Sequence, residues 1–446
     1  MSWSVEQVLA LAPDPSSAKS GKDLSAARKW KTLGANEACA WGTIQGSGKD
    51  AYQTSIDLSG PAFRCSCPSR KFPCKHGLGL FLILAHQPSA MTEKAPPLWT
   101  TEWLSKRAGK EEKKAAKLAA PEAPPDHEAG AKALAASAKR AAARESKVSL
   151  GLEELGVWLG DLVRAGFATL PGKPSSFWQV PAARLVDAQA SGLARRVAVL
   201  DGITTTGEGW PVQLLREAAL LHLAREGWSR IESLPPETRA DLRTTVGYTT
   251  SQEDLLAQAG LRDQWAVVGR SVEETDEGLR VQRTWLFGRQ SGRPALCLSF
   301  SPGATQPLDT SLVPGSLLDA ELVFFPSAWP ARAVVKQRHG TTENFTPDYP
   351  HTSIAAANAF AAGAFSANPW IERVPFALAA VYPMRRTGGW IVRDEAGDCL
   401  TISLPERKAW RLLALSGGRS CAVAGEWNGQ SLHPLSVWSE GRFLPL

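Results

Sequence analysis

The chain has 446 residues, of which 43% are hydrophobic and 21% are charged, a balance typical of a folded protein with two or three domains. No segment approaches the roughly 18 consecutive apolar residues of a membrane-spanning helix, and the first residues lack the basic and apolar regions of a secretory signal. We therefore expect a cytoplasmic protein that does not cross a membrane. The seven cysteines are an odd number, and their spacing is not that of a disulfide framework.

The net charge of +6 is unevenly distributed along the chain. Residues 1–147 contain 22 Lys and Arg against 14 Asp and Glu, whereas the remaining residues contain 28 against 30. The basic part of the protein is thus its amino-terminal third, which makes nucleic acid one partner to consider.

The first predicted domain, residues 1–103, is a small β-rich module. Within it, residues 51–58 alternate apolar and polar side chains in the manner of a half-buried strand. Residues 77–86 are almost entirely apolar, which predicts a helix whose buried face lies against the rest of the module.

A glycine-rich stretch precedes that strand. Residues 45–49 suggest a phosphate-binding loop, but Thr43 and Asp50 stand where such a loop requires a glycine and a hydroxyl. A hairpin turn between two strands is the better interpretation, with Lys49 at its tip placed to contact a phosphate.

A twelve-residue segment of this module contains four potential metal ligands: Cys65, Cys67, Cys74 and His76. Residues two apart on a strand point the same way, so the Cys-x-Cys pair can reach one ion. The Cys-x-His pair follows a return loop and lies where the chain enters the predicted helix, so it approaches from the opposite side. Three sulfurs and one imidazole match a closed, structural Zn²⁺ site. We predict one zinc ion there and no catalysis, because a catalytic zinc keeps an open position.

The motif Cys65-Ser-Cys67, six residues, Cys74-Lys-His76 resembles the SWIM zinc finger, whose signature is Cys-x-Cys, a variable spacer and Cys-x-His. The similarity to bacterial members of that family extends over residues 30–90. It implies that the four residues bind zinc and that the protein takes part in DNA or protein interactions, and it implies no reaction. It also implies an AAA+ ATPase and a von Willebrand-type protein as partners, because these are neighbours of similar bacterial proteins.

Basic residues surround the predicted zinc site: Lys49, Arg64, Arg70, Lys71 and Lys75. With nearby aromatic side chains they form a candidate contact surface for nucleic acid or another partner. The alternative is that they neutralise the centre, whose formal charge with three thiolates and a neutral imidazole is −1.

Two regions follow the module. Residues 104–147 are rich in Ala, Lys, Glu and Pro and offer almost no large apolar side chain for burial, which predicts a flexible linker. We expect that linker to be helical on either side of a proline-rich break at residues 121–125. Apolar residues then recur with a 3.6-residue period through residues 148–263, which predicts an α-helical domain.

Residues 264–446 are predicted to be mostly β. Apolar runs of strand length are separated by turns, a pattern typical of a barrel or sandwich. An alanine-rich helix is expected at residues 355–365. The predicted strands are residues 265–268, 279–286, 295–300, 317–325, 331–335, 376–382, 390–392, 400–403, 411–415, 421–427 and 436–438.

The predicted fold class is therefore multidomain α+β, with a β-rich zinc module, a linker, an all-α domain and a mostly-β carboxy-terminal region. We expect a zinc-binding protein, not an enzyme, whose finger mediates protein–protein or DNA interaction. The alternative is an enzyme of unknown reaction in the carboxy-terminal region, with the finger as a targeting module. We find no nucleophile elbow, glycine-rich nucleotide motif or paired-carboxylate motif there, so we assign no catalytic or cofactor-binding residue.

Overall fold

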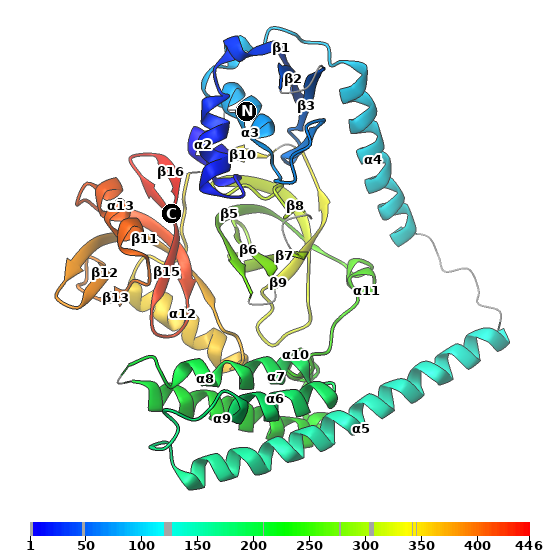
Figure 1. The fold of residues 1–446 in the computed structure, drawn as a ribbon, viewed down its shortest axis with the longest axis vertical. Helices are drawn as coiled ribbons and strands as arrows, with labels where there is room; N and C mark the ends of the chain where they lie inside the picture. Colours follow the sequence, from blue (N-terminus) through cyan, green and yellow to red (C-terminus); the bar gives the residue numbers. More distant parts are fainter. Residues whose placement is uncertain are drawn as a thin grey trace.

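The computed structural model describes residues 3–46, 50–119, 127–207, 209–275, 278–302, 307–340, 342–344 and 346–446. Its mixed α+β, multidomain architecture confirms the predicted fold class. Figure 1 shows the amino-terminal module and a helical bundle at opposite ends of the molecule, with the carboxy-terminal β region between them. None of the helices in the described ranges is long and apolar enough to span a bilayer.

The amino-terminal module is an antiparallel sheet covered by helices, with strand order β1-β2-β3-β4. The predicted hairpin is present, because β2 and β3 pair along their length. The apolar helix α3 is buried against β2, β3 and β4, as its sequence predicts. The elements are α1 (Val5–Ala10), α2 (Pro15–Asp23), the 3-10 turn η1 (Ala27–Lys29), β1 (Trp30–Ala35), β2 (Cys39–Gln45), β3 (Ala51–Asp57), β4 (Ala62–Cys65), α3 (Lys75–His86) and η2 (Pro88–Ala90).

Helices α1 and α2 differ from the β-rich structure predicted for residues 1–103. Both begin with standard capping chemistry. Ser4 and Gln7 form a reciprocal capping box at the start of α1. Asp14 caps α2, whose first residue is Pro15. These caps are the sequence signal that predicts the two helices.

The helical part contains two long helices and a compact bundle. Its core is one continuous cluster of buried side chains contributed by α5, α6, α7, α9 and α10. The elements are α4 (Leu98–Ala119), α5 (His127–Ala165), α6 (Ser176–Asp187), α7 (Ser191–Ala198), α8 (Leu200–Ile203), α9 (Trp210–Ser229), η3 (Ile231–Ser233), α10 (Pro236–Val246) and α11 (Gln252–Leu256).

The boundary predicted between residues 147 and 148 falls inside α5, which runs without interruption from His127 to Ala165. Composition changes there because Val148 is the first residue of α5 in the bundle core, while residues 135–142 of the same helix are exposed. Alanine and lysine favour helix whether or not a face is buried, so composition alone does not mark the end of an element. The predicted proline-rich break at residues 121–125 lies outside the described residues.

The carboxy-terminal region contains two successive barrels. In the first, the strands are joined in the order β5-β6-β7-β9-β8-β5, with β7 and β9 parallel and all other neighbours antiparallel. The elements are β5 (Leu261–Glu274), β6 (Leu279–Gly288), β7 (Pro294–Pro302), β8 (Ser316–Phe324), β9 (Arg332–Arg338) and the short β10 (Glu343–Asn344).

The second barrel repeats this order. Strands β13, β12, β11, β14 and β15 are consecutive neighbours, and a parallel bridge from Ile402 to Leu432 brings the end of β13 to β15. Each barrel thus has the strand order of an OB-fold, a partly open five-stranded Greek-key barrel. The elements are α12 (Ile354–Ala367), β11 (Val374–Arg386), β12 (Gly389–Arg393), β13 (Cys399–Thr401), α13 (Glu406–Ser416), β14 (Cys421–Trp427), β15 (Leu432–Ser439) and β16 (Arg442–Pro445).

One predicted strand is wrong. Residues 411–415 belong to helix α13, whose buried residues Ala409, Leu412 and Ser416 recur at helical spacing. The apolar run in this segment fits a short strand equally well, and only the longer period over eleven residues separates the two. All other predicted strands overlap observed ones.

The zinc module and the bundle both pack firmly on the β region. Thr310 donates a hydrogen bond to the Pro61 carbonyl (2.7 Å), and Val313 lies within the core of the zinc module. At the other end Trp370 is buried in the bundle core, and Asp241 accepts a hydrogen bond from the Ala328 amide (2.8 Å). The zinc module therefore packs on the β region, and the linker is not its only connection to the rest of the protein.

Candidate metal centre

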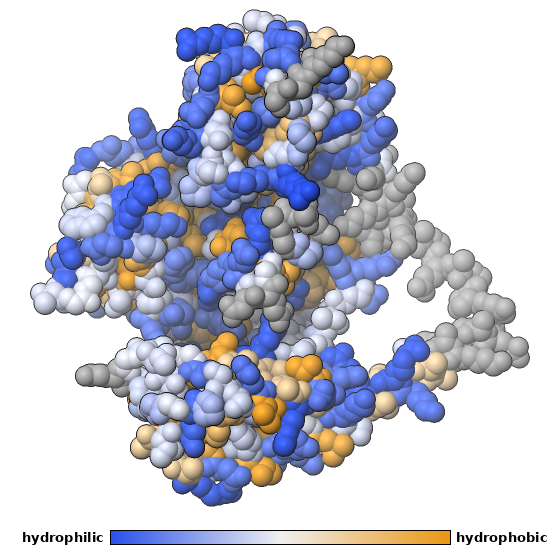
Figure 2. All heavy atoms as spheres, viewed as in Figure 1, coloured by the Kyte–Doolittle hydropathy of each residue, from blue (hydrophilic) through white to orange (hydrophobic). Residues whose placement is uncertain are grey.

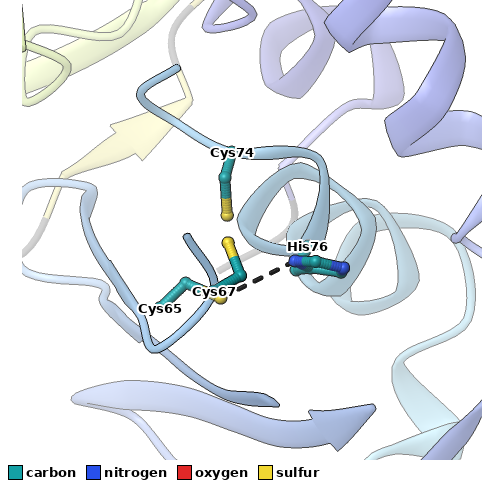
Figure 3. Close-up of side chains that lie close together, drawn as sticks. All are labelled: Cys65, Cys67, Cys74 and His76. Atoms are coloured by element: carbon teal, nitrogen blue, oxygen red, sulfur yellow. Dashed lines mark hydrogen bonds between the residues drawn. The ribbon is translucent and has the colours of Figure 1, made fainter. Parts of the chain in front are cut away.

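The four predicted ligands come from two short segments that face each other (Figure 3). Cys65 is the last residue of β4, and Cys67 follows two residues later. Cys74 is the N-cap of α3, and His76 lies in the first turn of that helix. The strand end and the helix start thus contribute two ligands each, as the sequence spacing predicts.

Ser66 fixes the direction of the Cys-x-Cys pair. Its amide donates to the Gln53 carbonyl (3.0 Å), and its hydroxyl accepts from the Gln53 amide (3.0 Å). These bonds keep the chain extended beyond the last residue of β4. Cys65 and Cys67 therefore point to the same side, because side chains alternate along extended backbone.

The ligand atoms of the four residues all lie within 4.8 Å of one another. Nδ1 of His76 lies 3.8 Å from Sγ of Cys65. Bonds of about 2.3 Å to sulfur and about 2.1 Å to nitrogen separate neighbouring tetrahedral ligand atoms by about 3.6 to 3.8 Å. The donor set and its spacing therefore fit Zn²⁺.

Neighbouring groups orient these ligands, and the sequence alone did not single them out. The Gly77 amide points at Sγ of Cys74 (3.5 Å), and Thr54 Oγ1 lies 3.3 Å from Sγ of Cys65. The ring of Tyr52 packs against the imidazole of His76, with 5.1 Å between centroids. Such contacts hold ligand rotamers in place before and after metal binding.

Without a metal, hydrogen bonds among the ligands shift the pKa values of Cys67, Cys74 and His76. Hydrogen bonds with Cys65 and Cys74 lower the pKa of Cys67 well below its usual value, and donation to Cys65 and Cys67 raises that of Cys74 well above it. Burial acts to lower the pKa of His76, but hydrogen bonds with Cys65 and Cys67 outweigh it and raise that pKa to about 9. Zinc must displace the protons on these groups, so its binding weakens as the pH falls.

The arrangement suits a structural metal. Four protein ligands complete a tetrahedron, which leaves no position for a water or substrate. Cys74 and His76 are buried, whereas Cys65 and Cys67 are half-buried. Within the described residues the cluster contains no carboxylate that would act as a general base. A bound zinc would join β4 to α3 across a loop that has no regular structure of its own.

Comparison with known families agrees with this geometry. Residues 57–85 match the model of the SWIM zinc finger, which includes all four ligands. The chain contains a SWIM zinc finger. Residues 143–246 match the SWIM-associated four-helix bundle domain, which corresponds to the core-forming part of α5 through α10. Searches of curated proteins and of solved structures returned no match. The chain thus carries two domains of the SWIM type, and its four ligands fit zinc, as the resemblance implies.

The predicted contact residues around the SWIM finger differ in their surroundings. Lys71 forms an ion pair with Asp14 (2.9 Å), and Arg64 donates to the Trp99 carbonyl (3.1 Å). Arg70 and Lys75 are exposed. Within the described part of the chain, neither forms an ion pair with a carboxylate. Lys49 lies outside the described residues. Their role as a contact surface stays a prediction.

Asp14 is a residue of the SWIM module that sequence reasoning did not connect to the site. Although burial opposes it, hydrogen bonds from Ser16 and Lys71 lower the pKa of this carboxyl well below its usual range. The ion pair ties α2 to the loop between the two ligand pairs. Because Asp14 and Lys71 are 57 residues apart in sequence, no local sequence pattern predicts this ion pair.

Proposed function

We propose that this SWIM protein is a non-enzymatic interaction protein that binds a partner protein through its four-helix bundle. One observation carries the proposal. Nine of the thirteen large hydrophobic residues that are exposed in the described part of the chain lie between residues 150 and 223, on the bundle. Hydrophobic residues appear on the bundle surface at the lower end of Figure 2. A concentration of exposed apolar side chains on one domain favours a binding surface there.

The surface of the bundle also contains a groove. It has a volume of about 540 Å³, lies between α5 and α6, and is lined by side chains that include Trp158, Phe177 and Val180. Val180, one of the lining residues, is 52% exposed. Aromatic and aliphatic side chains in a groove between two helices favour an amphipathic segment of a partner.

In this proposal the zinc is structural. The closed coordination set supports that role, because it holds the module in the shape that packs on the first barrel. DNA binding by the finger has weaker support. Two of the predicted contact residues, Lys71 and Arg64, are already bound to Asp14 and to the Trp99 carbonyl.

The expected partners are the AAA+ ATPase and the von Willebrand-type protein implied by the family resemblance. We propose that the protein binds these partners in the cytoplasm. None of the seven cysteines is in a disulfide, which is the usual state of cysteines in a reducing compartment.

The test measures binding of each purified candidate partner to the zinc-loaded protein by isothermal titration calorimetry. The variant Val180→Glu places a charge in the groove and is expected to weaken binding at least tenfold. The matched control is Val272→Glu, which changes a 45% exposed valine in β5 of the first barrel. Equal binding by the groove variant and the control would contradict the proposal.

A further inference from the structure

A second surface combines arginine with exposed tryptophan at the outer edge of the second barrel. It consists of the β11–β12 hairpin and the outer face of α13, which Figure 1 shows at the left of the molecule, on the side of the second barrel away from the first. We call it the arginine–tryptophan patch. Its members are Arg385, Arg386, Trp390, Glu406, Arg407, Trp410 and Arg411.

The patch holds one aromatic ring in a fixed, accessible position. Trp410 is 46% exposed and packs edge to face on Trp390, with 4.9 Å between ring centroids. Glu406 accepts a hydrogen bond from both indole nitrogens, at 2.9 Å from Trp390 and 3.0 Å from Trp410. Arg385 lies over both rings and pairs with Glu406 (3.5 Å). With its N–H already bonded and its rotamer fixed, the exposed part of the Trp410 ring is an apolar contact surface that is available at little entropic cost.

Cations flank this ring. Arg407 and Arg411 are exposed and one helical turn apart, so their side chains are neighbours on the face that carries Trp410. Arg386 is exposed in the hairpin beside Arg385. Among the described residues no ion pair is recorded for Arg386, Arg407 or Arg411. Three arginines without a counter-charge beside an accessible ring attract a partner that is both anionic and aromatic.

The position in the barrel adds an independent argument. The hairpin that carries Arg385 and Arg386 joins the first and second strands of an OB-fold order. That loop is one of those with which OB barrels contact oligonucleotides. The corresponding hairpin of the first barrel carries Glu273 and Glu274 instead, so the basic character belongs to this barrel and is not a consequence of the topology.

We infer that the arginine–tryptophan patch binds single-stranded nucleic acid. Its arginines would contact phosphates, and Trp410 would stack on one base. A duplex presents no free base face to the ring, so an unpaired strand is the favoured ligand. This site is separate from the proposed partner groove on the bundle, and each can fail without the other.

The test uses fluorescein-labelled dT20 and rU20 with the full-length zinc-loaded protein, and follows fluorescence anisotropy at several salt concentrations. A 20-base-pair DNA duplex is the comparison ligand. We expect both single strands to bind more tightly than the duplex. Trp410→Ala is expected to weaken binding about 5- to 150-fold, the range for loss of one stacked base, whereas Trp410→Phe retains most of it.

The charge variant is Arg407→Glu/Arg411→Glu. We expect at least a tenfold loss of affinity and a decrease of about 1.4 in the slope of log K against log salt, as for two lost phosphate contacts. Its matched control is Arg70→Glu/Lys75→Glu, which makes the same change in net charge on the zinc module and is checked for zinc content. Equal effects of the two double variants, a loss confined to the control, or no preference for single strands over duplex would each overturn the inference.

Discussion

The first barrel, built from β5 to β9, has an acidic first hairpin that is held by ion pairs, whereas the second, built from β11 to β15, has a basic first hairpin. In the first barrel Glu273 of that hairpin strand is bound by Arg283 (2.6 Å) and Arg373 (2.8 Å). In the second, Arg385 and Arg386 occupy the corresponding place, and Arg386 has no recorded ion pair.

Loops of the first barrel contact both ends of the molecule. The loop before β8 enters the zinc module through Val313, and the loop between β8 and β9 meets the bundle at Ala328. The first barrel thereby links the zinc module to the bundle. The two barrels share one strand order and differ in the charges and contacts of their loops.

The largest expected effect removes the zinc. In Cys74→Ser we expect loss of about one equivalent of zinc and a loss of stability on the order of 10 kcal/mol in the SWIM module. Hydrogen exchange should then rise in the module and in the first-barrel loops that hold it, while the second barrel stays protected. Metal analysis and exchange mass spectrometry measure both.

The control for that variant is Cys399→Ser, which changes an exposed cysteine of β13 outside the cluster. It should keep its zinc and its exchange pattern. Uniform deprotection of both barrels in Cys74→Ser would show that they do not respond separately.

The next effect concerns the ion network that joins the barrels. The Glu426 carboxylate is almost fully buried on β14 of the second barrel and accepts from Arg283 of the first (2.9 Å) and from Arg373 (2.6 Å). Glu426→Gln removes the buried charge partner of two cations, which then keep only the half-exposed Glu273, so we expect a loss of about 3 kcal/mol in the free energy of unfolding. Urea denaturation measures it. Glu440→Gln, which breaks an exposed pair with Arg419, should cost under about 1 kcal/mol.

A pH effect should single out the second barrel. Burial lowers the pKa of His351 from 6.5 to about 4, in a site where the ring accepts from the Ala377 amide (3.0 Å) and contacts Phe360 and Phe376. Between these values the unfolded chain binds a proton that the folded chain does not. Stability is therefore complete above about pH 6.5 and falls toward pH 4, by up to about 3 kcal/mol.

Thermal unfolding between pH 7 and pH 4 measures this dependence. His351→Gln should flatten it, while His222→Gln, which changes an exposed histidine of the bundle, should leave it intact. An equally steep dependence in His351→Gln would assign the effect to other groups.

The smallest effect tests how far the first barrel supports the zinc module. Val313→Ala removes two buried methyl groups from the module core, so we expect a loss of about 1.5 kcal/mol. The zinc site should be kept, because Val313 touches no ligand. Val272→Ala, at an exposed position of the same barrel, should change stability by less than about 0.5 kcal/mol. Chemical denaturation at saturating zinc compares the two variants.

Much of this architecture could be predicted where the determinants are local. The spacing of Cys65, Cys67, Cys74 and His76 indicated the metal site, because strand and helix geometry fix which neighbouring side chains converge. Alternating and apolar runs located most strands of both barrels. Residues 411–415 were misassigned because a short apolar run fits both helix and strand.

What the sequence could not supply depends on contacts between distant segments. The identical order of the two barrels rests on the parallel contacts of β7 with β9 and of Ile402 with Leu432, which no local pattern encodes. The same holds for the arginine–tryptophan patch, where Trp390 and Trp410 meet only after the barrel folds.

The sequence by itself therefore determined the zinc ligands, the helical and β regions and the uneven charge, because each depends on spacing or composition within a few turns of the chain. Tertiary structure alone decided that the SWIM module is packed on the first barrel, and that cations and an exposed indole gather on the second. Those outcomes require side chains far apart in sequence to share one surface or one core, and the free energy that brings them together comes from burial across whole domains.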